Sequence, residues 1–520
     1  MISGMENRSQ DTPGSGRRPL LIPSIFGIAA LFLILIPSLY GYGGPFIDEL
    51  YYVACSERPA WGYVDHPPFA PILLRVSRAV FGESMLALRL PPAVAAAALV
   101  FGVGALARRL GAGTFGQSLA CVALLSAPLL QIMAGFFSMN IFELLLWGGL
   151  SWLLVEIELR PAPRLWLLFG ALAGVALLNK HTVVLFASAL AVGVLVTPAR
   201  RHLGRRWLWL GVLIAGALVL PNLLWQVAND WPSLEFYRNA NLYKQTKIPA
   251  LAVLALQAVF VNPGTLPVWI AGLFFLLRRP ELRHVGIAYL VMLALLTVAH
   301  ESRPDRIAGA YPVLFAAGGV ALERLLRAPG RSLLTWGLWL WLGLWSAALI
   351  PLGLPILPPA TTARWATFLG VVPQMERGEG KRSALPQWFA DRYGWEQLVD
   401  DVVAAAERLT PEERDRAVIF APSYGQAGAL EWLGRDRGLG PVYSTHNTYY
   451  LWGPPRDPVD VAIVVGNDAA TLGTLFEDVQ LAKVYRCEFC MPWRDGMSIW
   501  IVRHPRGSIA SHWPEWKHFE

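Results

Sequence analysis

Long apolar stretches separated by short polar gaps run through the first two thirds of the chain. The first, 21–41, carries no charged residue and is long enough to cross a bilayer core of about 30 Å as a helix. Similar stretches recur at 85–107, 113–134, 138–157, 164–179, 182–197, 206–226, 251–277, 284–299, 308–326 and 332–352. The pattern therefore predicts an α-helical polytopic membrane protein with about eleven transmembrane helices.

From residue 353 onward, the pattern changes to short apolar runs within more polar sequence. Three runs predict β-strands, at 417–421, 459–465 and 498–502, and helical periodicity lies between them at 395–408 and 425–434. Thr410 followed by Pro411 is typical of a helix start. Strands that alternate with helices predict a C-terminal soluble α/β domain over 353–520.

Two polar segments flank the first apolar stretch. The polar composition of residues 1–20 predicts a tail without packed structure. We interpret this tail as the cytoplasmic part of an uncleaved signal anchor. Residues 42–84 are too many for a simple connector, and their apolar spacing predicts helices that lie along the membrane surface. The membrane domain would thus extend over 21–352 and include this large first outer loop.

Composition and charge agree with this organisation. The chain is 55% hydrophobic and only 16% charged, whereas soluble proteins average about 25% charged residues. The net charge of +7 does not indicate nucleic acid, because the basic residues lie in alternate gaps between apolar stretches, as at Arg108 and Arg109. Positively charged loops stay in the cytoplasm. We therefore predict a membrane protein with a cytoplasmic N-terminus and a C-terminal domain on the outside, in the periplasm or its equivalent.

The predicted outer loops hold the unusual polar residues. Asp48 and Glu49 would point about 100° apart on a helix, so one would be a working carboxylate and the other its partner or a cap. Asp48 can also simply cap a helix that begins at Glu49. Asp65 and His66 precede two prolines that fix the backbone. Such a pair can bind a divalent metal ion or a phosphate, or form an ordinary polar turn.

Lys180 lies between two apolar stretches, where charges are costly and usually face a cavity or a partner. It is the strongest candidate for a phosphate contact, although it can also extend to the membrane interface. The other candidates at the same predicted face are Asn140, Glu143, Arg238, Asn239, Asn241, Arg303 and Arg306. In the soluble domain, Cys487 and Cys490 form a C-x-x-C pair, for which a local disulfide or inert pair, a redox-active pair and a metal site remain alternatives.

A carboxylate beside cations at an outer membrane surface suits the transfer of a sugar from a lipid phosphate. The carboxylate can deprotonate an acceptor hydroxyl as it attacks the anomeric carbon, and cations or a metal ion stabilise the departing phosphate. The chain shows no Gly-rich phosphate loop, so no nucleotide is expected. A transporter or flippase of lipid-linked sugars is the alternative, but such proteins usually contain repeats and place their charges near the midplane.

Several motifs in residues 40–320 resemble the GT-C glycosyltransferases of the protein-mannosyltransferase and aminoarabinose-transferase type (glycosyltransferase family 39 and its relatives). They are Asp48-Glu49, Asp65-His66-Pro67-Pro68, Leu88-Arg89-Leu90-Pro91, Ser138-Met139-Asn140 with Glu143, Leu177-Leu178-Asn179-Lys180, Pro221-Asn222-Leu223-Leu224-Trp225-Gln226 and Ala310-Tyr311-Pro312. The C-terminal stretch resembles the exported domain of a bacterial subgroup, with motifs that include Tyr424-Gly425-Gln426-Ala427-Gly428 and Leu451-Trp452-Gly453-Pro454.

The resemblance implies a GT-C fold and an inverting transferase. Its donor would be a polyprenyl-phosphate sugar, and its acceptor a membrane glycolipid, an envelope glycan or a protein. Asp48 would be the catalytic base and Glu49 would support it. Asp65 stands where relatives place a metal-binding acid, and His66 where the aminoarabinose type has a lysine near the donor phosphate.

The chain also departs from the family pattern at two places. Asn140 replaces an aspartate found in many relatives, so Glu143 would carry part of its role. Asp305-Arg306 stands where many relatives have paired tyrosines. The resemblance thus makes Arg306 a donor-phosphate contact particular to this subgroup.

Overall fold

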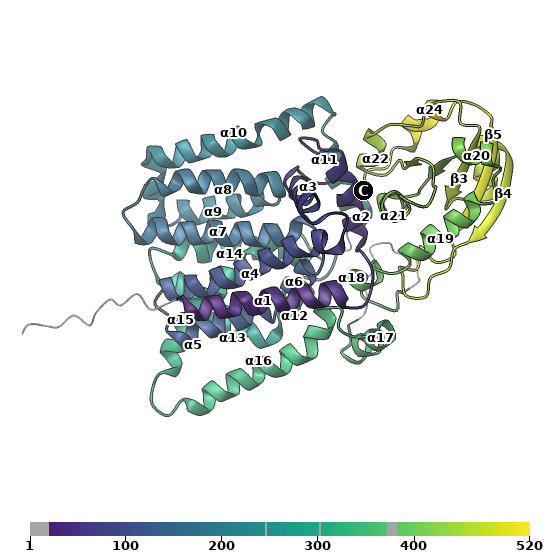
Figure 1. Cartoon of the computed structure of the whole chain (residues 1–520). Helices are drawn as coiled ribbons and strands as arrows, with labels where there is room; N and C mark the ends of the chain where they lie inside the picture. The colour runs from purple at the N-terminus through teal and green to yellow at the C-terminus, as the bar shows by residue number, and fades with distance from the viewer. Residues whose placement is uncertain (1–19, 245–246, 301–302, 372–381) are drawn as a thin grey trace, which may run out of the picture.

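Helices fill the first two thirds of the chain, and a small mixed sheet lies in the last third (Figure 1). The computed structural model describes residues 20–244, 247–300, 303–371 and 382–520, so nearly all of the predicted tail at 1–20 lies outside the described residues. Every predicted apolar stretch contains a helix. These helices are α1 (Leu21–Tyr40), α4 (Met85–Arg109), α5 (Thr114–Leu125), α6 (Pro128–Ala134), α7 (Met139–Leu159), α8 (Leu165–Asn179), α9 (Val183–Leu195), α10 (Arg206–Ala228), α12 (Ala250–Phe260), α13 (Leu266–Arg278), α14 (Arg283–Val298), α15 (Tyr311–Leu326) and α16 (Ser332–Gly353).

The described residues contain five helices that are long and apolar enough to cross a membrane: α1, α4, α7, α10 and α16. The number rises to eight if each of three bent helix pairs counts as one span. Two further apolar helices, α8 and α14, are shorter. The chain is thus a multi-pass membrane protein, and the count of about eleven spans stays a prediction.

Two stretches that the sequence predicts as single spans, 113–134 and 251–277, are bent, and a third bend follows directly after the predicted stretch 182–197. α5 and α6 meet at 60°, α9 meets the short turn η1 (Pro198–Gly204) at 106°, and α12 meets the segment that contains α13 at 89°. The second segment of each pair begins with a proline, at Pro128, Pro198 or Pro263. Proline has no N–H to donate and its ring clashes with the preceding turn, so it begins a helical segment rather than continuing one.

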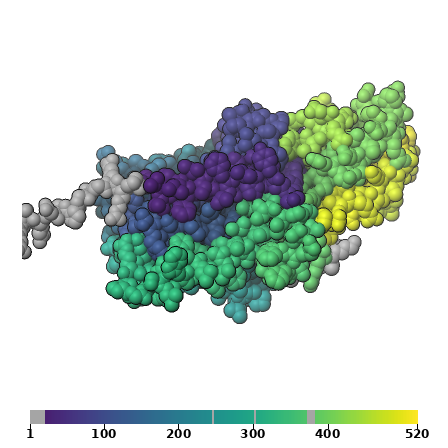
Figure 2. All heavy atoms as spheres, turned by 60° about the horizontal axis from the view of Figure 1, so that its bottom comes forward, coloured from purple at the N-terminus to yellow at the C-terminus, as the bar shows by residue number. Residues whose placement is uncertain are grey.

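Large apolar side chains are exposed along the outside of the bundle. Ile28 and Phe32 of α1 and Leu333 and Trp336 of α16 are more than half exposed. Figure 2 shows these two helices on one face of the bundle. Soluble monomers rarely expose apolar patches of this extent, so the lipid bilayer is the solvent that this surface requires.

The predicted outer loops gather at one end of the bundle. The loop at 42–84 forms α2 (Ile47–Glu57) and α3 (Phe69–Phe81), which confirms the helices expected there. Both lie beside the soluble domain, as does α11 (Pro232–Asn239), whereas α1 begins at the opposite end (Figure 1). The candidate residues on these segments therefore face the same side.

The soluble domain is built on a five-stranded sheet with the order β2-β1-β3-β5-β4. The strands are β1 (Val418–Phe420), β2 (Val442–Tyr443), β3 (Val461–Val465), β4 (Phe476–Val484) and β5 (Ser498–Pro505). β1 pairs in parallel with β2 and β3, whereas β5 runs antiparallel to β3 and β4. The helices after α16 are α17 (Pro359–Phe368), α18 (Gln387–Ala390), α19 (Trp395–Ala406), α20 (Pro411–Arg416), α21 (Tyr424–Leu433), α22 (Thr448–Leu451), α23 (Ala469–Leu475) and α24 (Ile509–His512).

The predicted alternation of strands and helices is confirmed for β1, β3, β5, α19 and α21. Thr410 also caps α20 as predicted, because its hydroxyl oxygen accepts a hydrogen bond from the Glu413 amide at 3.2 Å. The sequence did not predict β2 or β4. β2 has only two residues, and β4 is an edge strand with exposed glutamate, aspartate and lysine positions, which are residue types uncommon in strands.

Candidate active site

Asp48 lies in the first turn of α2 and is half-buried. The hydroxyl of Tyr424, from the soluble domain, donates a hydrogen bond to Asp48 Oδ1 at 3.2 Å. Asp48 does not cap the helix, because the cap position is Phe46 and the capping carboxylate belongs to Glu49. The alternative interpretation of Asp48 as a simple helix cap is therefore wrong.

Glu49 points away from Asp48 into the protein and is fully buried. Its carboxylate accepts hydrogen bonds from the amides of Phe46 and Phe137, both at 2.7 Å. The Glu49 carboxylate also forms an ion pair with the buried guanidinium of Arg89 on α4, with 2.8 Å between Nη2 and Oε2. Glu49 thus fixes the start of α2 to α4 and to the segment before α7.

Tyr51 lies one turn after Asp48 in α2, and Asp65 and His66 lie beside the Tyr51 ring. Tyr51 donates its hydroxyl hydrogen to Asp65 Oδ1 at 2.9 Å. The His66 ring is 1% exposed, and its Nε2 lies 3.9 Å from Asp65 Oδ1. Burial lowers the pKa of His66, and the negative charge of Asp65 only partly opposes that effect. A neutral His66 ring that packs among tyrosines is better suited to hold Asp65 in place than to contact a donor phosphate directly.

Tyr52 links the two aspartates to α7. Burial raises the pKa of Tyr52, and the negative charges of Asp65 and then Asp48 raise it further, as expected for a phenol close to both carboxylates. The Tyr52 hydroxyl oxygen accepts a hydrogen bond from the Met139 amide at 3.4 Å. Met139 is the first residue of α7 and precedes Asn140, so the aspartates and the polar start of α7 form one cluster.

Lys180 follows α8 and turns toward α7 rather than toward solvent. Its Nζ donates hydrogen bonds to Asn140 Oδ1 and to Glu143 Oε2, both at 2.8 Å. The Lys180 side chain is 11% exposed, and that of Glu143 is 3% exposed. Thr182 donates a hydrogen bond to the other oxygen of Glu143. Asn140 and Glu143, both singled out from the sequence, therefore hold this cation in place.

Two more cations approach Lys180 from the loop before α15. Arg303 forms a two-pronged ion pair with Asp305, at 2.9 and 3.1 Å. Burial alone would raise the pKa of Asp305, but the charge and hydrogen bonds of Arg303 outweigh burial. The charges of Lys180 and Arg306 lower the pKa of Asp305 further, so that it lies well below its usual range. Arg303 thus binds this carboxylate directly, and the positive charges of Lys180 and Arg306 also act on it.

Tyr237 on α11 lies between this cationic group and the aspartates. Burial raises its pKa, and the negative charges of Asp65 and Glu143 raise it further. Arg306 acts in the opposite direction. The Tyr237 hydroxyl also lies 3.1 Å from His181 Nδ1. Sequence reasoning assigned no role to Tyr237, although it lies within the candidate loop after α10.

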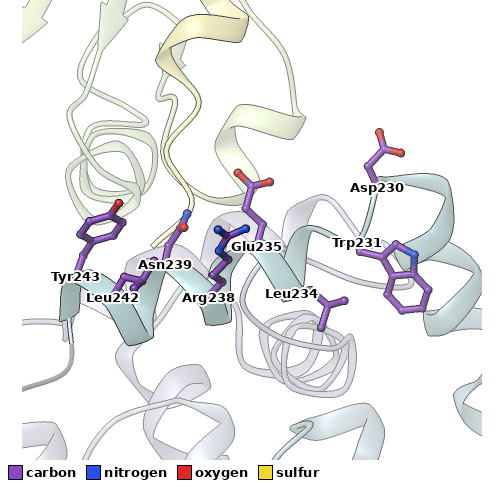
Figure 3. A pocket seen from close by; sticks show the side chains of 8 residues that line it. All are labelled: Asp230, Trp231, Leu234, Glu235, Arg238, Asn239, Leu242 and Tyr243. Atoms are coloured by element: carbon purple, nitrogen blue, oxygen red, sulfur yellow. The ribbon is translucent and has the colours of Figure 1, made fainter. Parts of the chain in front are cut away.

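The other candidates of that loop lie on a different face of α11. Arg238 and Asn239 line an open groove of about 530 Å³, on the side of α11 turned toward the soluble domain (Figure 3). Asn239 Nδ2 donates a hydrogen bond to the Phe519 carbonyl at 2.8 Å. Asn241 follows in the π-helical turn η2 (Ala240–Lys244) and is exposed. Arg238, Asn239 and Asn241 thus form a surface beside the aspartate cluster.

Sequence reasoning missed the contribution of the soluble domain. Its helix α21 packs closely on α2, because a side chain at Gly425 would meet Ile47 at 2.4 Å and one at Gly428 would meet the Leu50 carbonyl at 2.6 Å. The two glycines, three positions apart, share one face of α21. Their spacing next to Tyr424 was a readable signal of a close helix contact.

The described residues do not assemble a metal centre around Asp65. Among them, no group of three or more histidine, cysteine, aspartate or glutamate side chains is placed to hold a metal ion. This also applies to the described surroundings of Cys487 and Cys490. Asp65 thus does not have two further side chains of these types beside it among the described residues, and the steps derived below use the protein's own side chains.

Part of the chain matches a known family. Residues 65–225 match the family model described as dolichyl-phosphate-mannose-protein mannosyltransferase. A curated polyprenol-phosphate-mannose–protein mannosyltransferase of Corynebacterium glutamicum is 27% identical over 160 residues, which cover 28% of this chain and 31% of that relative. The match thus spans about a third of the relative's length.

The similarity to solved structures covers almost the whole chain. ArnT from Cupriavidus metallidurans bound to undecaprenyl phosphate is 17% identical, with a TM-score of 0.60, and the match covers 92% of this chain and 97% of ArnT. The apo state of ArnT matches equally well, with 16% identity and the same TM-score. At this level of identity the similarity shows a shared fold, including the arrangement of the membrane and soluble parts.

Proposed function

We propose that this chain, a GT-C glycosyltransferase by its fold and by the family match over residues 65–225, is an inverting enzyme that moves a sugar from a polyprenyl phosphate to an envelope acceptor. One observation carries the proposal. The half-buried Asp48 accepts a hydrogen bond from Tyr424, whose ring packs against Tyr51, and Tyr51 donates a hydrogen bond to Asp65. Lys180 and Arg306, from two other segments, both lower the pKa of Asp305.

The proposed first step uses Asp48 as a general base. The carboxylate takes the proton of an acceptor hydroxyl while the hydroxyl oxygen forms a bond to the anomeric carbon. The bond between that carbon and the phosphate oxygen breaks on the opposite side, and the configuration inverts. The polyprenyl phosphate leaves with the negative charge that the bond electrons carry.

The proposed role of the cations is to accept that charge. Lys180 is held by Asn140 and Glu143 before the substrate arrives, so little reorganisation accompanies the reaction. Arg306 adds a planar donor suited to phosphate oxygens. Two related proteins support the donor class: the ArnT structure contains undecaprenyl phosphate, and the curated relative is named for polyprenol-phosphate-mannose.

We place this chemistry at the outer face of the inner membrane. Basic residues such as Arg108 and Arg109 end α4, and positively charged ends stay in the cytoplasm. The N-terminus would then be cytoplasmic and the soluble domain periplasmic. The acceptor in this compartment would be a glycolipid such as lipid A, another glycan or a protein.

The direct test is mass spectrometry of envelope glycolipids and glycoproteins from cells with and without the gene. We expect one sugar to disappear from one acceptor class and to return with the wild-type gene. A parallel assay supplies the purified protein with undecaprenyl phosphate that carries a neutral hexose, an amino sugar or a uronic acid. Identical envelopes, together with no sugar transfer from any of these donors, would contradict the proposal.

Arg306→Gln is expected to weaken binding of undecaprenyl phosphate about tenfold, because it removes a charged hydrogen-bond donor from the phosphate. Binding of this probe can be measured by titration in detergent. Arg456→Gln, at an exposed position of the soluble domain, is the matched control and should bind like the wild type. Equal affinity of the Arg306 and Arg456 variants would remove Arg306 from the phosphate site.

A further inference from the structure

We infer that the soluble domain completes the active site, and that Tyr424 is a positioning residue that holds the Asp48 carboxylate in its working orientation. The inference rests on the proposed function, because it concerns the orientation of the proposed base. It goes further in assigning a role in the reaction to a residue of the soluble domain.

The first support is the way in which Tyr424 is held. It is the first residue of α21, and its ring packs against Tyr51 at 4.7 Å between centroids and stacks on His446 at 4.9 Å with 10° between the planes. Its amide donates a hydrogen bond to His446 Nδ1 at 3.3 Å. The ring therefore has little freedom, and the hydroxyl that reaches Asp48 Oδ1 has a defined position.

The second support is the firm attachment of the domain to α2. Arg58, directly after α2, forms two hydrogen bonds with Glu431 of α21, at 2.7 and 3.1 Å. Glu431 also accepts a hydrogen bond from the Tyr449 hydroxyl at 2.7 Å. With the close approach of α21 at its two glycines, these contacts make α2 and α21 one packed unit rather than a tethered pair.

The third support is a parallel arrangement at the other aspartate. The hydroxyl oxygens of Tyr51 and Thr448 lie 2.5 Å apart, and the Thr448 amide donates a hydrogen bond to the Tyr51 oxygen at 3.2 Å. Thr448, at the start of α22, thereby fixes the tyrosine that donates to Asp65. Both carboxylates of the cluster thus receive a tyrosine hydroxyl whose position the soluble domain sets.

The chemical consequence concerns the charge and direction of Asp48. A hydrogen bond donated to a carboxylate favours its ionised form, which is the form that can accept a proton from the acceptor. It also selects one rotation of the carboxyl group among several. Loss of this hydrogen bond should therefore reduce the turnover rate and make the base protonate at a higher pH, without changing donor binding.

The test is Tyr424→Phe in the full-length protein, which keeps the ring and removes only the hydroxyl. The assay uses the undecaprenyl-phosphate sugar that the wild type turns over and follows kcat and KM across pH. We expect kcat to fall about tenfold at neutral pH, the acidic limb of the rate profile to move to higher pH, and the donor KM to stay unchanged.

Tyr449→Phe is the matched control, because it removes a hydroxyl from the same interface that contacts Glu431 rather than Asp48. It should keep the wild-type pH profile. A wild-type profile and kcat for Tyr424→Phe would overturn the inference and leave the proposed function intact. Equal losses in both variants with lower thermal stability would also overturn it, since they would indicate docking alone. If the wild type transfers no sugar, the proposed function fails and the inference falls with it.

Discussion

Asp48→Asn is expected to reduce sugar transfer by about a thousandfold or more, because an amide cannot take the proton of the acceptor hydroxyl and general-base catalysis contributes about 10² to 10⁴ in rate. The substitution keeps the size of the side chain. Its amide oxygen can still accept the hydrogen bond from Tyr424. Transfer is measured with purified protein and the undecaprenyl-phosphate sugar that the wild type uses.

Asp230→Asn is the matched control for this experiment. Asp230 is exposed at the same end of the bundle, on the rim of the groove along α11 (Figure 3). The same chemical change there should leave transfer near the wild-type rate. Undiminished transfer by a folded Asp48→Asn protein would exclude Asp48 as the base, and the mechanism would need a different carboxylate.

Glu49→Gln is expected to destabilise the protein by about 3–5 kcal/mol, because it leaves the buried guanidinium of Arg89 without its counter-charge. Both side chains are fully buried, with 2.8 Å between Nη2 and Oε2. The neighbouring Asp48→Asn change carries no such cost. Asp48→Asn should therefore lose sugar transfer but keep its stability, whereas Glu49→Gln should lose stability. Thermal unfolding in detergent measures the difference.

Two further variants sharpen this prediction. Asp400→Asn breaks an ion pair with Arg437 whose side chains are 52% and 39% exposed, and such surface pairs contribute at most about 1 kcal/mol. The double variant Glu49→Gln/Arg89→Leu removes both buried charges and should be more stable than Glu49→Gln alone. If Glu49→Gln unfolds at the same temperature as Asp400→Asn, the buried pair does not stabilise α2 as described.

Sequence reasoning located the membrane helices because the bilayer imposes a strong local rule, namely a long apolar stretch for each span. The predicted GT-C resemblance and the α-helical membrane fold with a soluble α/β domain are confirmed. The bends at Pro128 and Pro263 were not predicted, since an apolar run continues through each of these prolines, whereas Pro198 directly follows the predicted stretch 182–197. Hydropathy indicates whether a segment lies in an apolar environment, but it does not indicate whether the backbone is straight.

The candidate site was predictable in its local parts. Lys180, Asn140 and Glu143 meet because the adjacent helices α7 and α8 bring the start of one and the end of the other together, and each carries a polar residue where an apolar one is usual. The bond between Tyr424 and Asp48 joins residues 376 positions apart. No local periodicity encodes such a pairing, so the contribution of the soluble domain to the site emerged only from the packed structure.

The packing of α21 on α2 also has a consequence for biogenesis. Leu50, Tyr51, Ala54 and Cys55 of α2 share one apolar cluster with residues of the soluble domain. The ribosome makes α2 long before it makes α21, so this apolar face has no partner until the soluble domain has been made and has folded. A shortened form that ends after α16 would keep that face uncovered, and the membrane part alone is therefore a poor starting point for a minimal version of the protein.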